Sequence, residues 1–304
     1  MRKSAVATFS VIVIAAALCF LFYAVGPMQG LFADFNTREV QVNKTIAAAG
    51  IDSIDLSAGS ADVEIVLGDA EQIRANLHGR AGTLTAKRIQ VRAETRGDTL
   101  NVSLERPGGW LFGGIFGWMT ARLTLTVELP EKQWKALQVA AASGNIRLSQ
   151  IRSDQLSART GSGKIALENA ENGDIALRTG SGDITANHFR ADKMSAETGS
   201  GDIRLTDGEA KLTGQTGSGN IRLETDALRR DADLRTGSGD VDVRLASAPS
   251  SLAVDVRTGS GSERIEWDGF AAEEKSRSVL RGAFGDGGVK LTVRTGSGDF
   301  TLGR

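Results

Sequence analysis

Hydrophobic and polar residues alternate on both sides of a Gly-rich turn that returns throughout the second half of the chain. Counted from the first residue of the turn, positions −4, −2, +5 and +7 are apolar, as in Leu156, Ala158, Ile165 and Leu167. Alternation of this kind predicts two short strands, each with one buried face. The turn reads Thr-Gly-Ser-Gly and begins, at intervals of 19, 19, 18, 20, 22 and 37 residues, at Thr160, Thr179, Thr198, Thr216, Thr236, Thr258 and Thr295.

A unit of this size cannot bury its apolar face alone, but stacked units can. Neighbouring strands in such a stack lie about 4.8 Å apart and are joined by backbone hydrogen bonds. The period therefore predicts an all-β fold, a β-solenoid or parallel β-helix-like stack of repeats of about 19 residues. Less regular copies upstream suit the terminal turns of a solenoid. Their apolar places hold Ile54, Leu56, Val63 and Ile65, then Leu137, Val139, Ile146 and Leu148.

The same pattern divides the chain into two extended sections. Residues 35–130 carry longer alternating segments, with a hairpin turn at 96–98, and form a β-rich lead-in or cap. Residues 131–304 form the repeat solenoid. Near its end, an Asp-Gly-Gly turn at 286–288 predicts a C-terminal hairpin between "SVLRGAF" and "VKLTVRT". We expect this hairpin to cover the open edge of the stack.

The turn residues themselves indicate a structural role. Glycine either adopts positive φ or lets neighbouring rungs approach closely, and Thr and Ser hydroxyls satisfy local backbone groups. The residue after the second Gly is often Asp, as in calcium-binding β-rolls, but Lys164 and Asn220 interrupt the series and the nonapeptide spacing is absent. We therefore predict no cofactor and disfavour Ca²⁺. The structural turn residues are Thr160, Gly161, Thr179, Gly180, Thr198, Gly199, Thr216, Gly217, Thr236, Gly237, Thr258, Gly259, Thr295 and Gly296.

An apolar stretch near the N-terminus predicts a transmembrane signal-anchor. Residues 5–25 are almost wholly apolar and long enough to cross a bilayer as a helix. Two basic residues precede the stretch, so we expect a cytoplasmic tail at 1–4, a linker at 26–34 and an extracytoplasmic remainder. The protein is then a single-pass protein of the cell membrane. A cleaved signal peptide is the alternative, because a small-residue site stands at 24–26.

Charge and cysteine content narrow the classes of function. The formal net charge is −1 at pH 7, from 36 basic and 37 acidic residues. The chain lacks the excess of basic residues that is typical of nucleic-acid-binding proteins, so we do not expect nucleic acid as a partner. The single cysteine, Cys19, lies inside the predicted span, so the exported part must fold without disulfides.

One segment, "GWLFGGIFGWM" at Gly109–Met119, does not fit a plain strand. Gly-rich aromatic segments lie in a membrane interface, fill a partner's pocket, or fold over the end of a solenoid as a hydrophobic plug. All three interpretations stay open from the sequence. The aromatic residues are Trp110, Phe112, Phe116 and Trp118.

A row of arginines is predicted on one outer face of the stack. The residue immediately before each turn points outward on its strand, and in most copies it is Arg. Such a row suits anionic cell-wall polymer or lipid headgroups through charge-assisted hydrogen bonds. The alternative is a solvated face on which each Arg pairs with an acid such as Asp233 or Asp255. The arginines are Arg159, Arg178, Arg235, Arg257 and Arg294.

An enzymatic role is the competing hypothesis. Asp183 and Asp202 fall on adjoining rungs, which makes a carboxylate pair available for polysaccharide cleavage. Yet most copies carry an acid at this place, whereas a catalytic pair is a local exception to a repeat. His78 and His188 are the only histidines and lie far apart in the sequence. We find no nucleophile–base set and predict that the protein is not an enzyme.

The N-terminal stretch, a lead-in ending in "LTVELP", and the "SGNI" and "TGSGDI" turns resemble a bacterial β-strand-repeat family of unknown function whose members are named as adhesins. Some members belong to Lia-type cell-envelope stress operons. The resemblance implies an extracytoplasmic solenoid with surface or envelope-stress roles, and it transfers no catalytic residue. We expect a membrane-anchored, adhesin-like binding or scaffold module of the cell envelope. The alternatives are a polysaccharide-active β-helix enzyme and an accessory sensor that acts through a membrane-protein partner.

Overall fold

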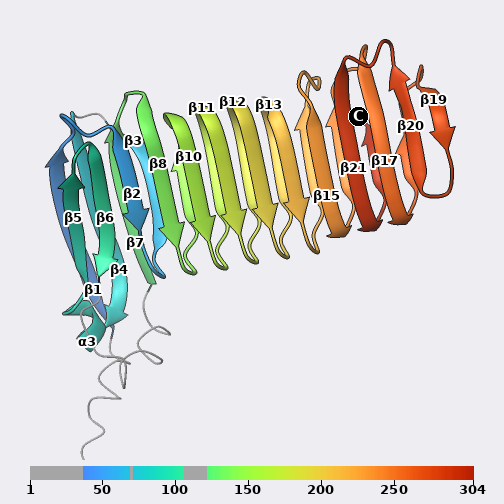
Figure 1. Ribbon diagram of the computed structural model, residues 1–304. Helices are drawn as coiled ribbons and strands as arrows, with labels where there is room; N and C mark the ends of the chain where they lie inside the picture. Colours follow the sequence, from blue (N-terminus) through green and yellow to red (C-terminus); the bar gives the residue numbers. More distant parts are fainter. Residues whose placement is uncertain (1–36, 69–70, 106–121) are drawn as a thin grey trace, which may run out of the picture.

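The computed structural model describes residues 37–68, 71–105 and 122–304, which form a long stack of β-rungs (Figure 1). The N-terminal elements are β1 (Thr37–Ala47), β2 (Ser53–Ser57), β3 (Asp62–Gly68), β4 (Gln72–Gly82), α3 (Thr83–Ala86), β5 (Gln90–Arg96), β6 (Thr99–Glu105) and β7 (Arg122–Pro130). The central strands are β8 (Trp134–Ala141), β9 (Ile146–Ser149), β10 (Arg152–Thr160), β11 (Ile165–Thr179), β12 (Ile184–Thr198), β13 (Ile203–Thr216), β14 (Ile221–Thr225), β15 (Ala232–Ser238) and β16 (Val241–Leu245). The C-terminal strands are β17 (Leu252–Ser260), β18 (Glu263–Ile265), β19 (Ala271–Lys275), β20 (Val279–Phe284), β21 (Val289–Ser297) and β22 (Phe300–Gly303).

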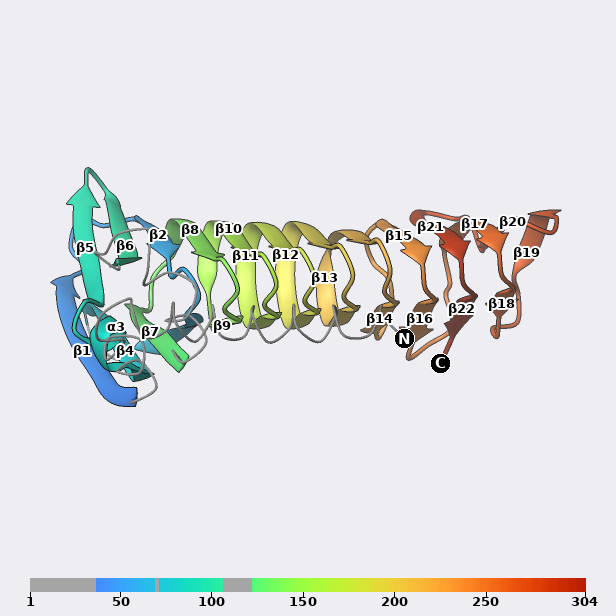
Figure 2. The same cartoon turned by 90° about the horizontal axis from the view of Figure 1, so that it is seen from below.

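Each rung contributes to two layers that run side by side along the stack (Figure 2). Strands before the Thr-Gly-Ser-Gly corner make the front layer, and strands after it make the back layer. β11, β12 and β13 are long enough to leave the back layer, bend, and enter the front layer of the next rung. Pairing between central rungs is parallel and in register, so that Ile165, Ile184 and Ile203 occupy equivalent places.

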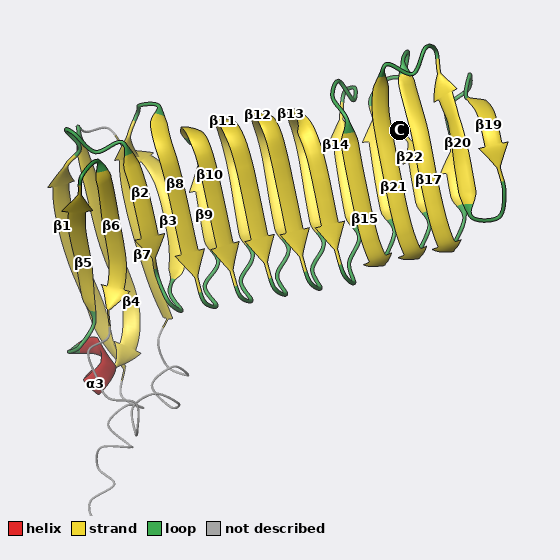
Figure 3. Ribbon diagram, viewed as in Figure 1, coloured by secondary structure: helices red, strands yellow, loops and turns green. Residues whose placement is uncertain are grey.

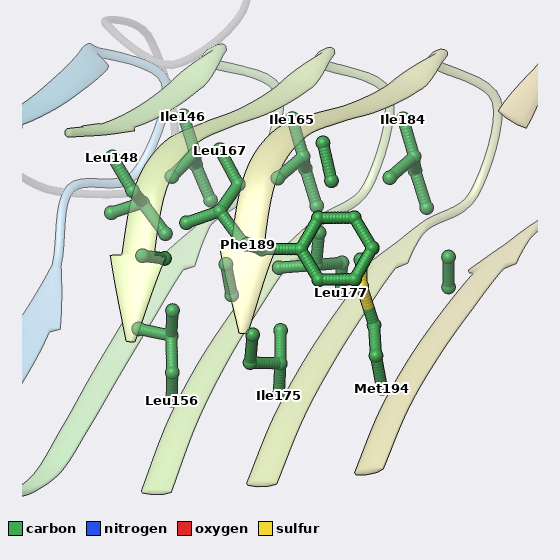
Figure 4. Packing of buried hydrophobic residues seen from close by; sticks show 14 of the residues in the cluster. Ile146, Leu148, Leu156, Ile165, Leu167, Ile175, Leu177, Ile184, Phe189 and Met194 are labelled. Atoms are coloured by element: carbon green, nitrogen blue, oxygen red, sulfur yellow. The ribbon is translucent and has the colours of Figure 1, made fainter. Parts of the chain in front are cut away.

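The core lies between the layers and is built from the alternating apolar positions. Side chains stack from rung to rung, with Ile146, Ile165 and Ile184 in one line and Leu156 and Ile175 in another (Figure 4). None of these five side chains is more than 2% exposed. Burying one such side chain stabilises a protein by about 1.5–3 kcal/mol, and every rung repeats the gain. The predicted all-β repeat solenoid is confirmed.

The corner threonine joins its rung to a neighbouring rung at every corner except that of Thr258, whose hydroxyl donates to Glu263. The Thr198 hydroxyl donates to the carbonyl of Gly182 at 2.8 Å and accepts from the N–H of Gly201 at 3.2 Å. A Cβ at Gly201 would lie 1.9 Å from the Gly182 carbonyl oxygen, and its φ is outside the left-handed region. Close approach of the rungs therefore requires this glycine, and positive φ does not. Equivalent donor bonds come from Thr160, Thr179, Thr216, Thr236 and Thr295.

At both ends of the stack the order of rungs in space differs from their order in the chain. β2 and β3 lie between the rung of β6 and β7 and the rung of β8 and β9. At the other end, β21 and β22 lie between the rung of β15 and β16 and the rung of β17 and β18. Antiparallel strands continue the layers beyond these rungs: β5 beside β6, β4 and β1 beyond β7, and β20 and β19 beyond β17.

The predicted C-terminal hairpin at 286–288 is wrong. The turn joins β20 to β21, but these strands do not pair, since β17 lies between them and pairs with both. β21 carries the full repeat, with Leu291 and Val293 at its apolar places, so it gains two in-register neighbours by entering the stack. β20 and β19 cover the edge instead. The hairpin at 96–98 is confirmed, because β5 and β6 pair antiparallel around it.

Within the part of the chain that the structure describes, no helix is long and apolar enough to cross a membrane. The predicted anchor at 5–25, its cytoplasmic tail and the linker all lie outside the described residues. Membrane anchoring therefore stays a prediction.

Candidate functional site

The residues of the predicted arginine row lie in one line on the outer surface of the front layer, where Glu197 and Gln215 separate two groups of arginines. Because β21 lies between β15 and β17, three arginines follow one another on adjoining rungs at one end. The order of the chain does not reveal this, because Arg294, the last of the three in the sequence, lies between Arg235 and Arg257 in the stack. In rung order the line reads Arg159, Arg178, Glu197, Gln215, Arg235, Arg294 and Arg257.

Acidic neighbours pair with only part of this row. Arg235 contacts Asp233 at 2.5 Å, and Arg257 contacts Asp255 at 3.7 Å, as the solvated-face alternative expects. The hydrogen bond and charge of Asp233 raise the pKa of Arg235. Arg294, between the two, has no acidic side chain within ion-pair distance among the described residues. The middle of the run therefore keeps its charge available to a ligand.

The same face has a trough that the repeat pattern did not reveal. Its volume is about 450 Å³, and short side chains such as Ser157 and Ala176 line it. Lys193 and Lys211 line it too, on adjoining rungs. Neither lysine has an ion-pair partner among the described residues. Both stand five residues before a corner threonine, a position that belongs neither to the apolar pattern nor to the arginine row.

The corner acids bind backbone amides of the next rung. Oδ1 of Asp183 accepts from the N–H of Asp202 at 3.1 Å, and Oδ1 of Asp202 accepts from the N–H of Asn220 at 2.8 Å. Asn220 does the same for Asp240 at 2.8 Å, which explains why Asn substitutes for Asp here. The Lys164 ammonium contacts the other oxygen of Asp183 at 2.8 Å, and these two bonds lower the pKa of Asp183. The carboxylates on adjoining rungs thus serve the corner itself.

No metal or acid–base constellation forms from the candidate residues. Among the described residues, no group of three or more His, Cys, Asp or Glu could hold a metal ion. His78 lies on β4 in the N-terminal cap, whereas His188 lies at the bend of β12, 3.5 Å from Asp207. The structure does not bring the two histidines together.

A larger groove lies on the edge of the stack away from the Thr-Gly-Ser-Gly corners. It has a volume of about 780 Å³ and follows the bends of β11, β12 and β13. Loops at 129–132 and 225–230 bound it. The sequence pattern describes the strands and one corner of each rung, so the opposite corner escaped notice.

The aromatic segment with Trp110, Phe112, Phe116 and Trp118 lies outside the described residues. β6 and β7, which precede and follow it, form the rung next to the antiparallel strands of the N-terminal cap. Plug, membrane contact and partner contact all stay open as predictions for this segment.

Comparison with known proteins supports the fold. The family model for Toastrack DUF4097 matches residues 51–303. A "putative lipid binding protein" from Parabacteroides distasonis has a TM-score of 0.51 at 16% identity, with 86% of this chain and 96% of that chain covered. A "putative adhesin" from Bacteroides fragilis has a TM-score of 0.47 at 12% identity, with the same shares covered. No curated protein matches the chain. The predicted resemblance to a repeat family with adhesin names is confirmed.

Proposed function

Because the chain belongs to the Toastrack DUF4097 family, we propose that it is a non-enzymatic, membrane-anchored binding or scaffold module of the bacterial cell envelope. Its ligand is an anionic polymer that lies along the front layer. The observation that carries this proposal is the run of Arg235, Arg294 and Arg257 on adjoining rungs.

The spacing of the run suits a chain of phosphate groups. Adjoining rungs lie about 4.8 Å apart, so the guanidinium groups form a regular cationic strip. Arginine binds phosphate through two parallel hydrogen bonds, which a lysine cannot do. Asp233 accepts two hydrogen bonds from Arg235, and Asp255 contacts both Arg257 and Arg281. A polyanion therefore competes with these acids at two of the three arginines and meets Arg294 without an acidic partner among the described residues. Lys193 and Lys211 extend the basic surface toward the middle of the same layer.

Location follows from the predicted anchor. A helix at 5–25 with two basic residues before it holds the solenoid outside the cytoplasm, next to the membrane surface and the cell wall. A part in envelope stress would be played through a membrane-protein partner. The structural neighbour named for lipid binding supports testing a lipid headgroup beside a polymer.

The test uses the full-length chain in non-ionic detergent and two soluble probes. Poly(glycerol phosphate) represents the polymer, and short-chain phosphatidylglycerol represents the headgroup. We expect the first to bind and the binding to weaken as salt rises. Replacing Arg235, Arg257 and Arg294 by Glu should lower affinity at least about tenfold.

A matched control separates this site from net charge alone. Arg38, Lys44 and Arg122 are exposed, lie in the N-terminal cap, and give the same change in charge when replaced by Glu. The control variant should bind poly(glycerol phosphate) as the parent does. Equal losses in both variants, or no loss in the first, would remove the arginine row from the function.

A further inference from the structure

The groove away from the corners is separate from the arginine row and is bounded at both ends. The loop at 129–132 borders one end and the loop at 225–230 borders the other. The second loop, between β14 and β15, lies beyond β13 and projects further than the bends of β11, β12 and β13 (Figure 3). A groove of about 780 Å³ is within the range of sites that enclose small ligands. The bends between these loops belong to four rungs, so a ligand that lies in the groove contacts about four of them.

One side of the groove is a row of polar residues in an unusual backbone conformation. The φ angles are 57°, 54°, 52° and 49° at Gln150, Asn169, His188 and Asp207. Residues with a Cβ seldom adopt this region, and Asn, His and Asp, which fill three of the four places, are the types that tolerate it best. The chain places glycine in it elsewhere, for example at Gly59, yet at none of these four bends. The four bends therefore present polar side chains at equivalent places on four successive rungs.

The side-chain amides of this row are free to bind a ligand. All four side chains are exposed. His188 and Asp207 lie 3.5 Å apart. The side-chain amides of Gln150 and Asn169 have no hydrogen-bond partner among the described residues. Each amide offers two donors and an acceptor to a ligand on its rung.

The other side of the groove is a row of alternating charge, Arg152, Glu171, Arg190 and Glu209. Arg152 lies 3.6 Å from Glu171, and Arg190 lies 3.9 Å from Glu209. The charges cancel along the row, so a polyanion gains nothing here. Between the rows, the floor is apolar and contains Phe189, which is 3% exposed. Amide, carboxylate and guanidinium groups beside an apolar floor suit a neutral chain that carries many hydroxyl groups.

We propose that this groove binds a linear, neutral glycan of about four sugar units, one for each bend. The bends recur at the strand spacing of about 4.8 Å, which is comparable with the advance of one pyranose in an extended glycan. Successive sugars therefore meet equivalent side chains on successive rungs. The protein then has two binding surfaces, one for a polyanion and one for a neutral glycan.

The test is calorimetric titration of the full-length chain in non-ionic detergent with three series of oligomers. The probes are β-1,4-linked N-acetylglucosamine, β-1,4-linked glucose and α-1,4-linked glucose, each with two, four or six units. We expect at least one series to bind, with affinity that rises from two units to four and changes little at six. Failure of all three series to bind would overturn the proposal, and so would affinity that keeps rising at six units.

Glycine variants remove the side chains without removing the fold. Glycine adopts positive φ freely, so replacing Gln150, Asn169 and His188 by Gly should leave the melting temperature about unchanged. Glycan affinity should fall about tenfold or more, because hydrogen bonds are lost on three rungs. A folded triple variant that binds as tightly as the parent would contradict the proposal.

The arginine variant distinguishes the two binding surfaces. Replacing Arg235, Arg257 and Arg294 by Glu should leave glycan binding unchanged, since these residues lie beside the opposite corner. The glycine variant should in turn bind poly(glycerol phosphate) as the parent does. A common loss in both variants would place both ligands at one surface and overturn the groove as a separate site.

Discussion

The corner threonines show how much one small buried side chain decides. Thr198 is 7% exposed, and its hydroxyl supplies both a donor to one rung and an acceptor within its own turn. Valine has nearly the same shape but neither function, and serine keeps both functions with less apolar bulk. The repeat therefore selects threonine for its hydrogen bonds and its shape together.

Replacing Thr198 by Val should destabilise the protein by about 1–3 kcal/mol. The substitution leaves a buried carbonyl and a buried N–H without partners, and such groups cost this much. Thr198→Ser should cost less. Urea unfolding monitored by circular dichroism gives both values, and a Val variant as stable as the parent would show that the hydroxyl is dispensable.

The corner carboxylates predict a loss of stability in acid. Bonds from the N–H and hydroxyl of Ser262 lower the pKa of Asp299, and a bond from Lys164 followed by one from the N–H of Asp202 lowers that of Asp183. A carboxyl whose folded pKa is depressed stabilises the protein above its unfolded pKa of about 3.9 and loses this as pH falls through the folded value. The urea concentration at the unfolding midpoint should therefore decrease as the pH is lowered below about 4.

Asp299→Asn keeps the Oδ1 acceptor for Ser262 but cannot titrate. The difference in urea midpoint between pH 7 and pH 3 should be smaller in this variant than in the parent. Equal differences in the two proteins would mean that Asp299 does not contribute to the acid dependence.

Individual elements show which parts of the fold the sequence could predict. The strands and their buried faces were predictable because apolar alternation is a local pattern. It identifies Leu156 and Ile175 as buried positions without any knowledge of the strands they pair with. The order of the rungs was not predictable, because every repeat presents nearly the same apolar face and the same corner to its neighbours. The bends at Asn169 and His188 lack an apolar signature, so neither they nor the groove appeared in the pattern.

The C-terminal edge strand illustrates protection against self-association. β19 has the sequence AAEEK, is exposed throughout, and pairs with β20 through an irregular register between Ala272 and Glu274. Charge and a bulge on an edge strand both discourage pairing with another molecule.

Replacing Glu273 and Lys275 by Val should make the protein associate. An apolar edge with free backbone groups invites strand pairing between molecules. Light scattering would report the association. Val at Thr185 and Arg204, on strands already paired on both sides, is the control and should leave the protein monodisperse. Equal scattering from both variants would assign the effect to hydrophobicity alone.

At the scale of the whole molecule, the interleaved end makes a sharp geometric prediction. In a protein whose Cys19 is replaced by Ser, cysteines at positions 235 and 294 should form a disulfide on mild oxidation, because their rungs adjoin. Cysteines at 235 and 257 should not, since one rung separates them and about 9.6 Å exceeds the reach of a disulfide. Mass spectrometry distinguishes the two. Cross-linking of the second pair alone would show that these rungs follow one another in the order of the chain and would contradict the interleaved order.

The position of β21 and β22 also bears on how the protein is made. Synthesis proceeds from the N-terminus, so β17 and β18 emerge before the strands that separate them from β15 and β16. The C-terminal end of the stack cannot take its final order until β21 and β22 have been synthesised. Completion of the chain, rather than the arrival of each repeat, then sets the moment at which this end matures. A molecule interrupted before Val289 differs from the finished one in its architecture as well as its length, and that difference is open to recognition by proteases.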